Sequence, residues 1–175
     1  MVGIPIKYRI KCANSECDVF TSKVHEVLAS ARGWKQAGVK FIETDSSREC
    51  DISISLVCDE CVRKKCGADF RKLSCTYWLE TPRRCYINLY RWINGAPNES
   101  RLELERYREY VINHEIGHAL GLEHDDCSRD NITAPVMLQH TIGVGMCEPN
   151  PWPLPREITA VIKKLKLKKN TGRYI

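Results

Sequence analysis

Alternating apolar and polar positions predict three β-strands in the first third of the chain, with one helix between the first and the second strand. Apolar residues that recur every three or four positions place this helix over Val19–Ala31. The stretch after the third strand, Cys58–Asp69, is polar, charged and rich in cysteine, and we expect a loop there. The three strands are expected over Ile6–Cys12, Val39–Glu43 and Asp51–Val57.

The rest of the chain combines two more strands with two helices. The strongest helical repeat runs from about Glu99 to Leu120. Gly121 is expected to end this helix, because glycine readily takes the positive φ with which a chain leaves a helix. An irregular segment rich in Pro, Gly and Asp follows, up to residue 153. The remaining elements are expected to be strands over Leu73–Leu79 and Cys85–Trp92 and a closing amphipathic helix over Leu154–Leu167.

These elements predict a single α+β domain over residues 1–175, with a mixed twisted sheet, one long helix and a C-terminal helix. The length suits one domain, and 43% hydrophobic residues are enough to bury a core. No apolar run approaches the roughly 18 residues of a membrane helix, so a membrane partner is not expected. Residues from about 156 to 175 are expected to form a basic helix and tail.

Ten cysteines are the unusual feature of the composition. This even number is high for a reduced intracellular protein, and it predicts disulfide bonds and an oxidising location. Residues 1–12 lack the apolar stretch, roughly 7–15 residues long, of a signal peptide. The protein is therefore expected either to be secreted after removal of a leader or to be oxidised by another route, as in a virus particle.

The segment from His114 to His124 carries the clearest chemical signal, because it reads His-Glu-Ile-Gly-His-Ala-Leu-Gly-Leu-Glu-His. Histidines at positions i and i+4 lie on one face of a helix, so His114 and His118 can bind the same ion. A turn at Gly121 would bring His124 back as a third ligand. Three protein ligands with an open fourth position are typical of catalytic rather than structural zinc.

Glu115 stands beside the first histidine, where its carboxylate can reach a zinc-bound water without being a ligand. Zinc lowers the pKa of such a water to about 7 and polarises a carbonyl oxygen. Glu115 would accept the proton of the water as it attacks a peptide carbon and would then pass it to the leaving amine. The motif therefore predicts zinc as cofactor and hydrolysis of peptide bonds in a polypeptide substrate.

The motif resembles the signature of the metzincin clan of zinc proteases, His-Glu-x-x-His-x-x-Gly-x-x-His. Metzincins also have a methionine turn beneath the metal, and Ala134-Pro135-Val136-Met137 follows the motif here. Within the clan, the stretch from Cys85 to Pro155 is most similar to a bacterial metzincin-like family known only as a domain of unknown function. The matching pieces are Ile87–Trp92, Gly95-Ala96-Pro97, the zinc motif, the methionine turn and Pro149–Pro153.

The resemblance implies a metzincin-like domain that acts as a zinc metalloendopeptidase. Metzincins pair an extended polypeptide with the edge strand of their sheet. Leu73–Leu79 is the candidate for this edge, although Cys85–Trp92 lies nearer the zinc motif in the sequence. The resemblance implies zinc ligands at His114, His118 and His124, a base at Glu115 and the methionine turn at Met137.

The residues after the methionine turn depart from the tyrosine-bearing turns of some metzincins. Leu138-Gln139-His140 stands there, so no tyrosine is assigned to transition-state stabilisation at this turn. His140 is either an additional polar group near the cleft or a solvated loop histidine, and we expect the solvated histidine.

Two groups of cysteines accompany these motifs. Cys127 and Cys147 flank the methionine turn, and the resembling family has cysteines in similar places, so we expect a disulfide that clamps the floor of the cleft. The second group forms either a structural zinc site or two disulfides. Its spacing lacks the paired symmetry of a zinc ribbon, and in an oxidising location we expect disulfides. The members of the second group are Cys58, Cys61, Cys66 and Cys75.

Two functions of other classes compete with the peptidase. One is a structural or particle-associated zinc protein, but Glu115 argues against it because a structural site has no use for a base. The other is a nucleic-acid-binding module that uses the second cysteine group and Lys163–Lys169, the most basic stretch. The formal net charge of +5 is too small to demand such a partner, and we expect a solvated helix face there.

Overall fold

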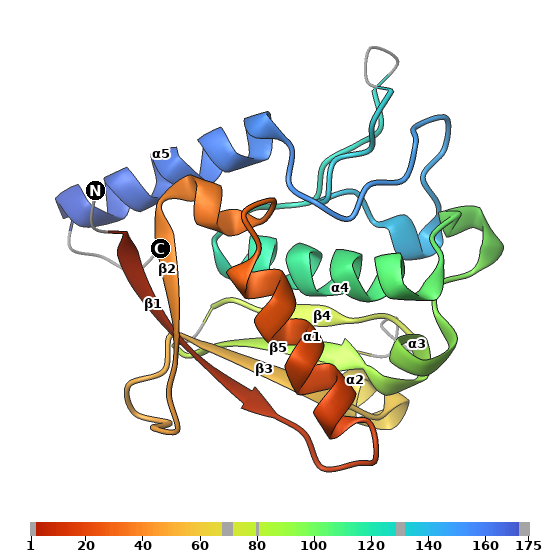
Figure 1. Cartoon of the computed structure of the whole chain (residues 1–175), viewed down its shortest axis with the longest axis horizontal. Helices are drawn as coiled ribbons and strands as arrows, with labels where there is room; N and C mark the ends of the chain where they lie inside the picture. The colour runs from red at the N-terminus through yellow and green to blue at the C-terminus, as the bar shows by residue number, and fades with distance from the viewer. Residues whose placement is uncertain (1–2, 68–71, 80, 129–131, 172–175) are drawn as a thin grey trace.

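One sheet of five strands organises the computed structural model, which describes residues 3–67, 72–79, 81–128 and 132–171, with side chains up to residue 166. The strands are β1 (Ile4–Lys11), β2 (Val39–Glu43), β3 (Ile52–Val57), β4 (Cys75–Tyr77) and β5 (Arg83–Asn88). Their order is β2-β1-β3-β5-β4, and all neighbours are parallel except β4, which runs antiparallel to β5 (Figure 1). This mixed sheet with helices confirms the single α+β domain.

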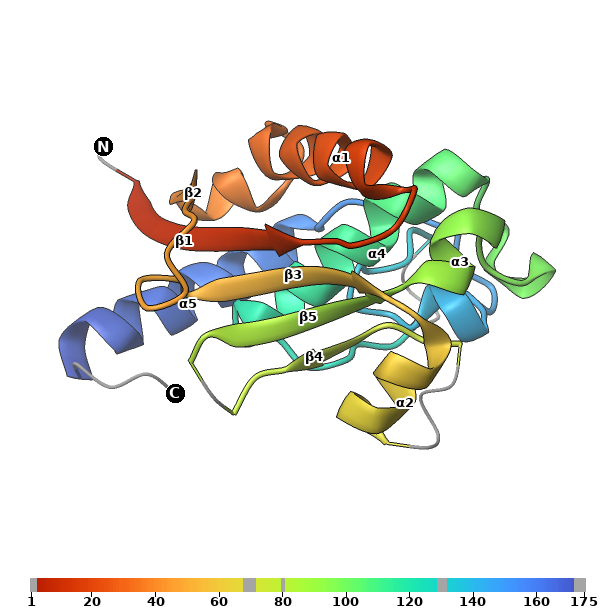
Figure 2. The same ribbon diagram turned by 90° about the horizontal axis from the view of Figure 1, so that it is seen from below.

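Helices pack on the sheet and on one another (Figure 2). α1 (Cys17–Ala29) contacts α4 (Leu104–Ala119), which also lies against β4 and β5. α5 (Pro155–Thr171) packs against the short 3-10 helix Trp34–Ala37. No helix in the described part of the chain is long and apolar enough to cross a membrane. The other helices are α2 (Asp59–Cys66), α3 (Leu89–Asn94) and the 3-10 turns Asn98–Ser100 and His140–Ile142.

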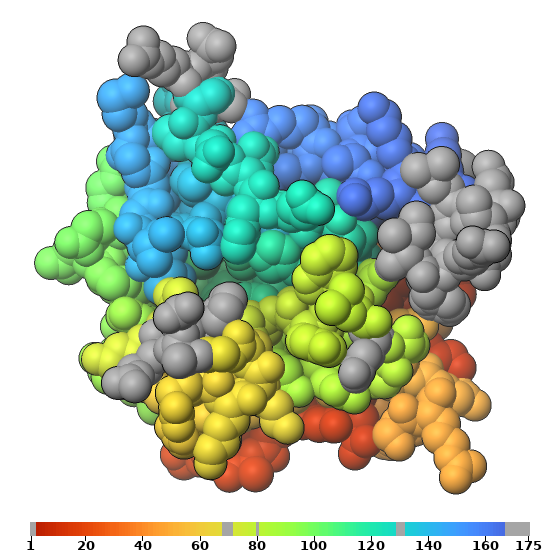
Figure 3. Space-filling view, turned by 180° about the vertical axis from the view of Figure 1, so that it is seen from behind, coloured from red at the N-terminus to blue at the C-terminus, as the bar shows by residue number. Residues whose placement is uncertain are grey.

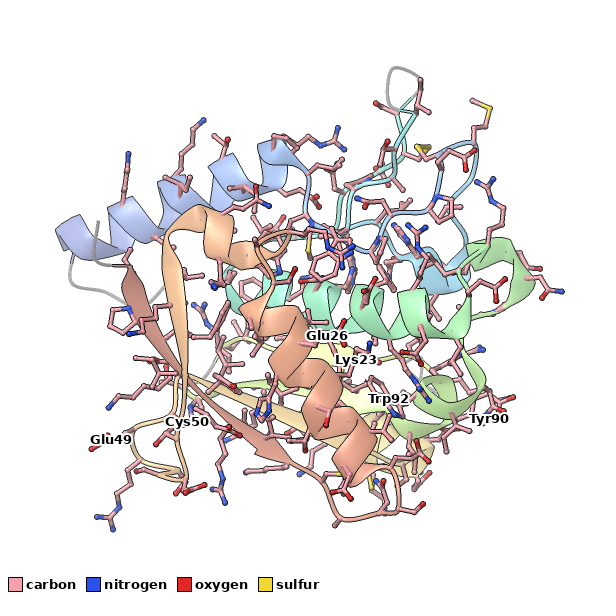
Figure 4. The ribbon with its side chains drawn as sticks, viewed as in Figure 1. Lys23, Glu26, Glu49, Cys50, Tyr90 and Trp92 are labelled. Atoms are coloured by element: carbon pink, nitrogen blue, oxygen red, sulfur yellow. A yellow bond between two sulfur atoms is a disulfide. The ribbon has the colours of Figure 1, made fainter. Side chains whose placement is uncertain are left out.

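Aromatic side chains join the helices in the core. Trp92 of α3, labelled in Figure 4, is fully buried. It meets the equally buried Phe20 of α1 edge to face, with 5.0 Å between the ring centroids. Arg108 of α4 lies over the Trp92 ring at 4.8 Å. Trp34 donates from Nε1 to the main-chain oxygen of Asn113 in α4 at 3.0 Å. These contacts hold α4, the helix of the histidine motif, in place over the sheet.

The stretch Cys58–Asp69 is not a loop, as the sequence suggested, because α2 occupies most of it. Cys58 caps this helix, and its sulfur accepts the N–H of Cys61 at 3.3 Å. Acidic residues stand in the first turn and basic residues in the last, which favours a helix through its dipole. Val62 is the one buried residue of α2, so the sequence has no apolar repeat that would predict this helix.

Two other expected boundaries were wrong. The strand expected over Cys85–Trp92 ends at Asn88, whose side chain accepts the N–H of Arg91 at 3.0 Å and so begins α3. The long helix begins at Leu104 rather than near Glu99, because Arg101 takes a left-handed conformation with φ of +52°. The other expected helices and strands are present with shifted ends, and Val39–Glu43 is unchanged.

Three disulfides are present among the described residues, and they are consistent with an oxidising environment. One of them, Cys127–Cys147, is the pair expected beside the methionine turn. Cys50, in the loop before β3 (Figure 4), and Cys85 are buried free thiols, whereas Cys58 and Cys61 are exposed free thiols. The other two disulfides are Cys12–Cys17 and Cys66–Cys75.

We expect thiol titration of the purified protein to distinguish the exposed thiols, the buried thiols and the disulfide-bonded cysteines. Two thiols, Cys58 and Cys61, should react quickly in the native protein, and Cys50 and Cys85 should react only after unfolding. Unfolded protein without reductant should therefore show four reactive thiols, and reduced unfolded protein should show ten. Six or more reactive thiols in the unreduced unfolded protein would contradict the three disulfides.

Candidate metal centre

Helix α4 places His114 and His118 one turn apart on the same side of the helix. Their Nε2 atoms lie 3.2 Å apart. His114 is buried, whereas His118 is partly exposed. The i, i+4 spacing of the motif therefore brings two imidazole rings to one point at the edge of the core.

A turn at Gly121 brings His124 to the same point. Gly121 has a φ of +95°, which residues with a Cβ rarely adopt. The N–H groups of Gly121 and Leu122 donate to the carbonyl oxygens of His118 and Gly117, each at 2.9 Å, and close the end of α4. The Nε2 atom of His124 then lies 3.1 Å from that of His118.

Hydrogen bonds determine which nitrogen carries the proton in two of the three histidines. Nδ1 of His114 lies 2.8 Å from the Val136 oxygen, and Nδ1 of His118 lies 2.8 Å from the Leu122 oxygen. Because a carbonyl oxygen can only accept, each Nδ1 carries the hydrogen. Burial lowers the pKa of His114 well below its usual value and that of His118 to about 4, so both rings are neutral at pH 7. Their Nε2 lone pairs therefore face each other.

Two of the three pairwise Nε2 separations fit a tetrahedral metal site, and all three candidate ligand atoms lie within 4.8 Å of one another. Zinc binds histidine nitrogen at about 2.0–2.1 Å, and tetrahedral angles then place two nitrogen ligands about 3.3 Å apart. The two measured Nε2 separations are 3.2 and 3.1 Å. Within the described residues, His114, His118 and His124 form the one group of three or more His, Cys, Asp or Glu that could hold a metal ion. Three neutral imidazoles would leave a fourth ligand position open.

Glu115 lies beside the three histidines and is only 3% exposed. Its Oε2 atom is 2.6 Å from Oγ1 of Thr76, on β4. Burial raises the pKa of Glu115 to about 8, although the hydrogen bond from Thr76 opposes this shift. A carboxylate in this environment is suited to exchange a proton near neutral pH.

The methionine turn lies directly against the helix segment between His114 and His118. Met137 is 1% exposed, and its side chain packs on Gly117. A Cβ atom at Gly117 would overlap the Met137 sulfur and would also touch the Trp34 ring at 3.0 Å, so glycine lets Met137 pack this closely without a shift. The structure thus places the expected turn under the histidine-bearing helix.

Glu157 of α5 fixes this turn. Its buried carboxylate accepts the main-chain N–H groups of Val136 at 3.2 Å and Met137 at 2.8 Å. It also accepts the N–H of Leu154 at 2.7 Å. Since the carbonyl oxygen of Val136 accepts the Nδ1 hydrogen of His114, Glu157 holds the residue that orients a candidate ligand.

His140 is fully buried, and the expectation of a solvated loop histidine was wrong. Its ring stacks on Tyr110 with 4.3 Å between centroids, and its Nε2 lies 2.9 Å from the Pro135 oxygen. The Tyr110 hydroxyl accepts the main-chain N–H of His140 and lies 3.3 Å from Nδ1 of His114. His140 therefore packs behind the metal centre, and it is not among the described residues that line the cleft.

An open cleft with a volume of about 220 Å³ runs along the metal centre. Residues of β4 and its neighbours, residues of α4, and Gln139, Thr141 and Ile142 line this cleft. On the face drawn in Figure 3, the yellow and yellow-green residues of α2 and β4 lie below the teal residues that follow α4. Apart from Glu115 and the histidines, the described lining residues carry no charge.

The second cysteine group does not form a four-cysteine zinc site, because Cys66 and Cys75 are joined in a disulfide. Two disulfides were expected among these four cysteines, without assigned pairs, and one is present. The second is not present, and Cys58 and Cys61 are exposed thiols. Cys66–Cys75 ties the end of α2 to the start of β4, the strand that walls the cleft.

Three residues that contact the histidines, Glu115 or the methionine turn were not predicted from the sequence. Glu157 had a local signal, since Pro155 begins α5 and a glutamate two residues later is typical of a helix start. Tyr110 had a weaker signal, because it lies one turn before His114 on the same helix. Thr76 had none, since only the fold brings β4 beside α4.

A family profile described as "protein of unknown function (DUF3152)" matches residues 4–148. The chain belongs to this family. No curated protein matches the chain. The DUF3152 match contains all three histidines, Glu115 and Met137 and ends before α5, so Glu157 lies beyond it.

In the metal-free protein, we expect Glu115 to lower the free energy of unfolding as the pH rises. Its pKa is about 8 in the folded state and about 4.3 in an unfolded chain, so between these values the folded state binds more protons. From pH 5 to 8 the loss should be on the order of 4 kcal/mol.

Urea unfolding of metal-free wild type and Glu115→Gln across this pH range measures the effect. The histidines titrate in both proteins, so the difference between them isolates Glu115. Wild type should lose stability relative to the variant as the pH rises. A difference that stays constant from pH 5 to 8 would contradict a buried carboxyl with a raised pKa.

Proposed function

We propose that the chain is a zinc-dependent metallopeptidase that cleaves an extended polypeptide. The observation that carries the proposal is the convergence of three histidines on one point beside a buried carboxyl group, all of which line an open cleft. A metal ion with three protein ligands keeps one position for a reactant, which suits catalysis rather than structure. The resemblance of the motif and the methionine turn to metzincins supports the same assignment.

The roles of the side chains follow from their positions. Zinc, when bound, would polarise the scissile carbonyl and lower the pKa of the attacking water. Glu115 would accept the proton of this water and deliver it to the leaving amine. His114 and His118 would be held as neutral ligands by their Nδ1 hydrogen bonds to main-chain oxygens.

The edge of the sheet offers a place for the substrate. β4 pairs with β5 on one side, and no strand in the described part of the chain pairs with its other side. An extended polypeptide could add to this free edge through main-chain hydrogen bonds, which would place it along the cleft. The uncharged lining favours segments with uncharged side chains near the scissile bond.

A structural or particle-associated zinc protein remains the competing function. Such a protein would gain nothing from Glu115, because burying a carboxyl group next to the site costs free energy. The open cleft beside the histidines likewise has no role in a purely structural site.

Cleavage of an unfolded protein mixture by zinc-loaded wild type and Glu115→Gln tests the proposal. Loss of the general base should reduce the cleavage rate by roughly 10²–10⁴-fold, while one zinc per chain stays bound. Glu123→Gln, which changes an exposed carboxylate of the same motif, is the matched control and should leave the rate unchanged. Equal rates for wild type and Glu115→Gln, or no cleavage by zinc-loaded wild type, would contradict the proposal.

A further inference from the structure

One side chain from outside α4 reaches the carboxylate of Glu115. Thr76 projects from β4, and its Oγ1 atom lies 2.6 Å from Oε2 of Glu115 and 3.0 Å from the main-chain oxygen of the same residue. Among the described residues, Thr76 provides the hydrogen bond to the Glu115 carboxylate.

The donors available to Glu115 decide where the threonine hydrogen goes. A hydroxyl has one hydrogen, so Thr76 cannot donate to both oxygens at once. Cys85 lies directly opposite Thr76 on β5, and its S–H donates to the main-chain oxygen of Glu115 at 3.5 Å. Because that oxygen has another donor and the contact to Oε2 is the shorter one, the threonine hydrogen belongs to Oε2.

This allocation distinguishes the two oxygens of the carboxylate. Oε2 is held by Thr76, whereas no described residue donates a hydrogen bond to Oε1. We propose that Thr76 is a positioning residue, which fixes Oε2 of Glu115 so that Oε1 is left to accept the proton of the attacking water. This inference rests on the proposed peptidase function.

The surroundings of Thr76 keep its hydroxyl in place. The preceding residue, Cys75, is bound by a disulfide to Cys66 of α2, and Thr76 itself pairs with Cys85 in the sheet. β4 also provides the free edge proposed for the substrate. The residue that orients the base therefore lies on the strand on which the polypeptide docks.

Substitution of Thr76 by valine and by serine tests the inference. Thr76→Val keeps the shape and removes the hydroxyl, whereas Thr76→Ser keeps the hydroxyl. A hydrogen bond to a charged group is worth about 1.5–3 kcal/mol, so kcat of zinc-loaded Thr76→Val should fall by roughly 10–100-fold. KM should change by less than about threefold, and Thr76→Ser should restore kcat to near the wild-type value.

Crystal structures of the zinc-loaded proteins provide a readout that does not depend on activity. The Glu115 carboxylate should be displaced or rotated in Thr76→Val and should keep its wild-type position in Thr76→Ser. An unmoved carboxylate in Thr76→Val, or equal losses of kcat in both variants, would overturn the inference. Absence of cleavage by wild type would instead contradict the proposed function, and the crystal structures would still decide whether Thr76 positions Glu115.

Discussion

The convergence of three imidazole rings on one point is the constraint around which this structure is arranged. His114 and His118 each donate their Nδ1 hydrogen to a main-chain oxygen, so each must turn an unprotonated Nε2 toward the other at 3.2 Å. Burial lowers the pKa of both rings, so they stay neutral and their Nε2 lone pairs are available. A metal ion at the point of convergence could accept these lone pairs together with that of His124.

Several distant segments serve this arrangement. The carboxylate of Glu157, near the start of α5, fixes Val136 and Met137, and Val136 in turn orients His114. Met137 packs against Gly117, where a Cβ atom would force the methionine side chain to shift. The C-terminal helix therefore helps to support the three histidines of the candidate metal centre, although it lies outside the matched family region. Groups that hydrogen-bond to or pack against metal ligands in this way orient the ligands and limit their motion.

Much of the site could be predicted from the sequence because its residues lie close together in the chain. The i, i+4 histidines and Gly121 lie within one helix and its end, so the geometry of a single helix determines how they meet. The Cys127–Cys147 disulfide was expected from the resemblance to a family rather than from geometry. Most strands were predicted because their apolar residues alternate or run together, as in β3.

The errors and omissions have two physical causes, which are local caps that a search for apolar repeats does not detect and tertiary contacts that no local pattern shows. α2 has one buried residue and is specified by its cap and charge pattern, which a search for apolar repeats overlooks. His140 lies in an irregular segment, and its burial follows from stacking on Tyr110 and from the contact of its Nε2 with the Pro135 oxygen. Thr76 contacts Glu115 across a sequence separation of 39 residues, and local sequence patterns do not predict contacts at this separation.

The most direct test of this account is an equilibrium zinc titration of the chelator-stripped protein against a competing chelator. The wild-type protein should bind one zinc ion per chain. In His118→Ala, which removes the ligand nearest the other two, affinity should fall by more than the roughly 100-fold associated with a change in an outer partner. Wild type that binds no zinc, or His118→Ala that binds it as tightly as wild type, would contradict the claim that these three histidines form the metal centre.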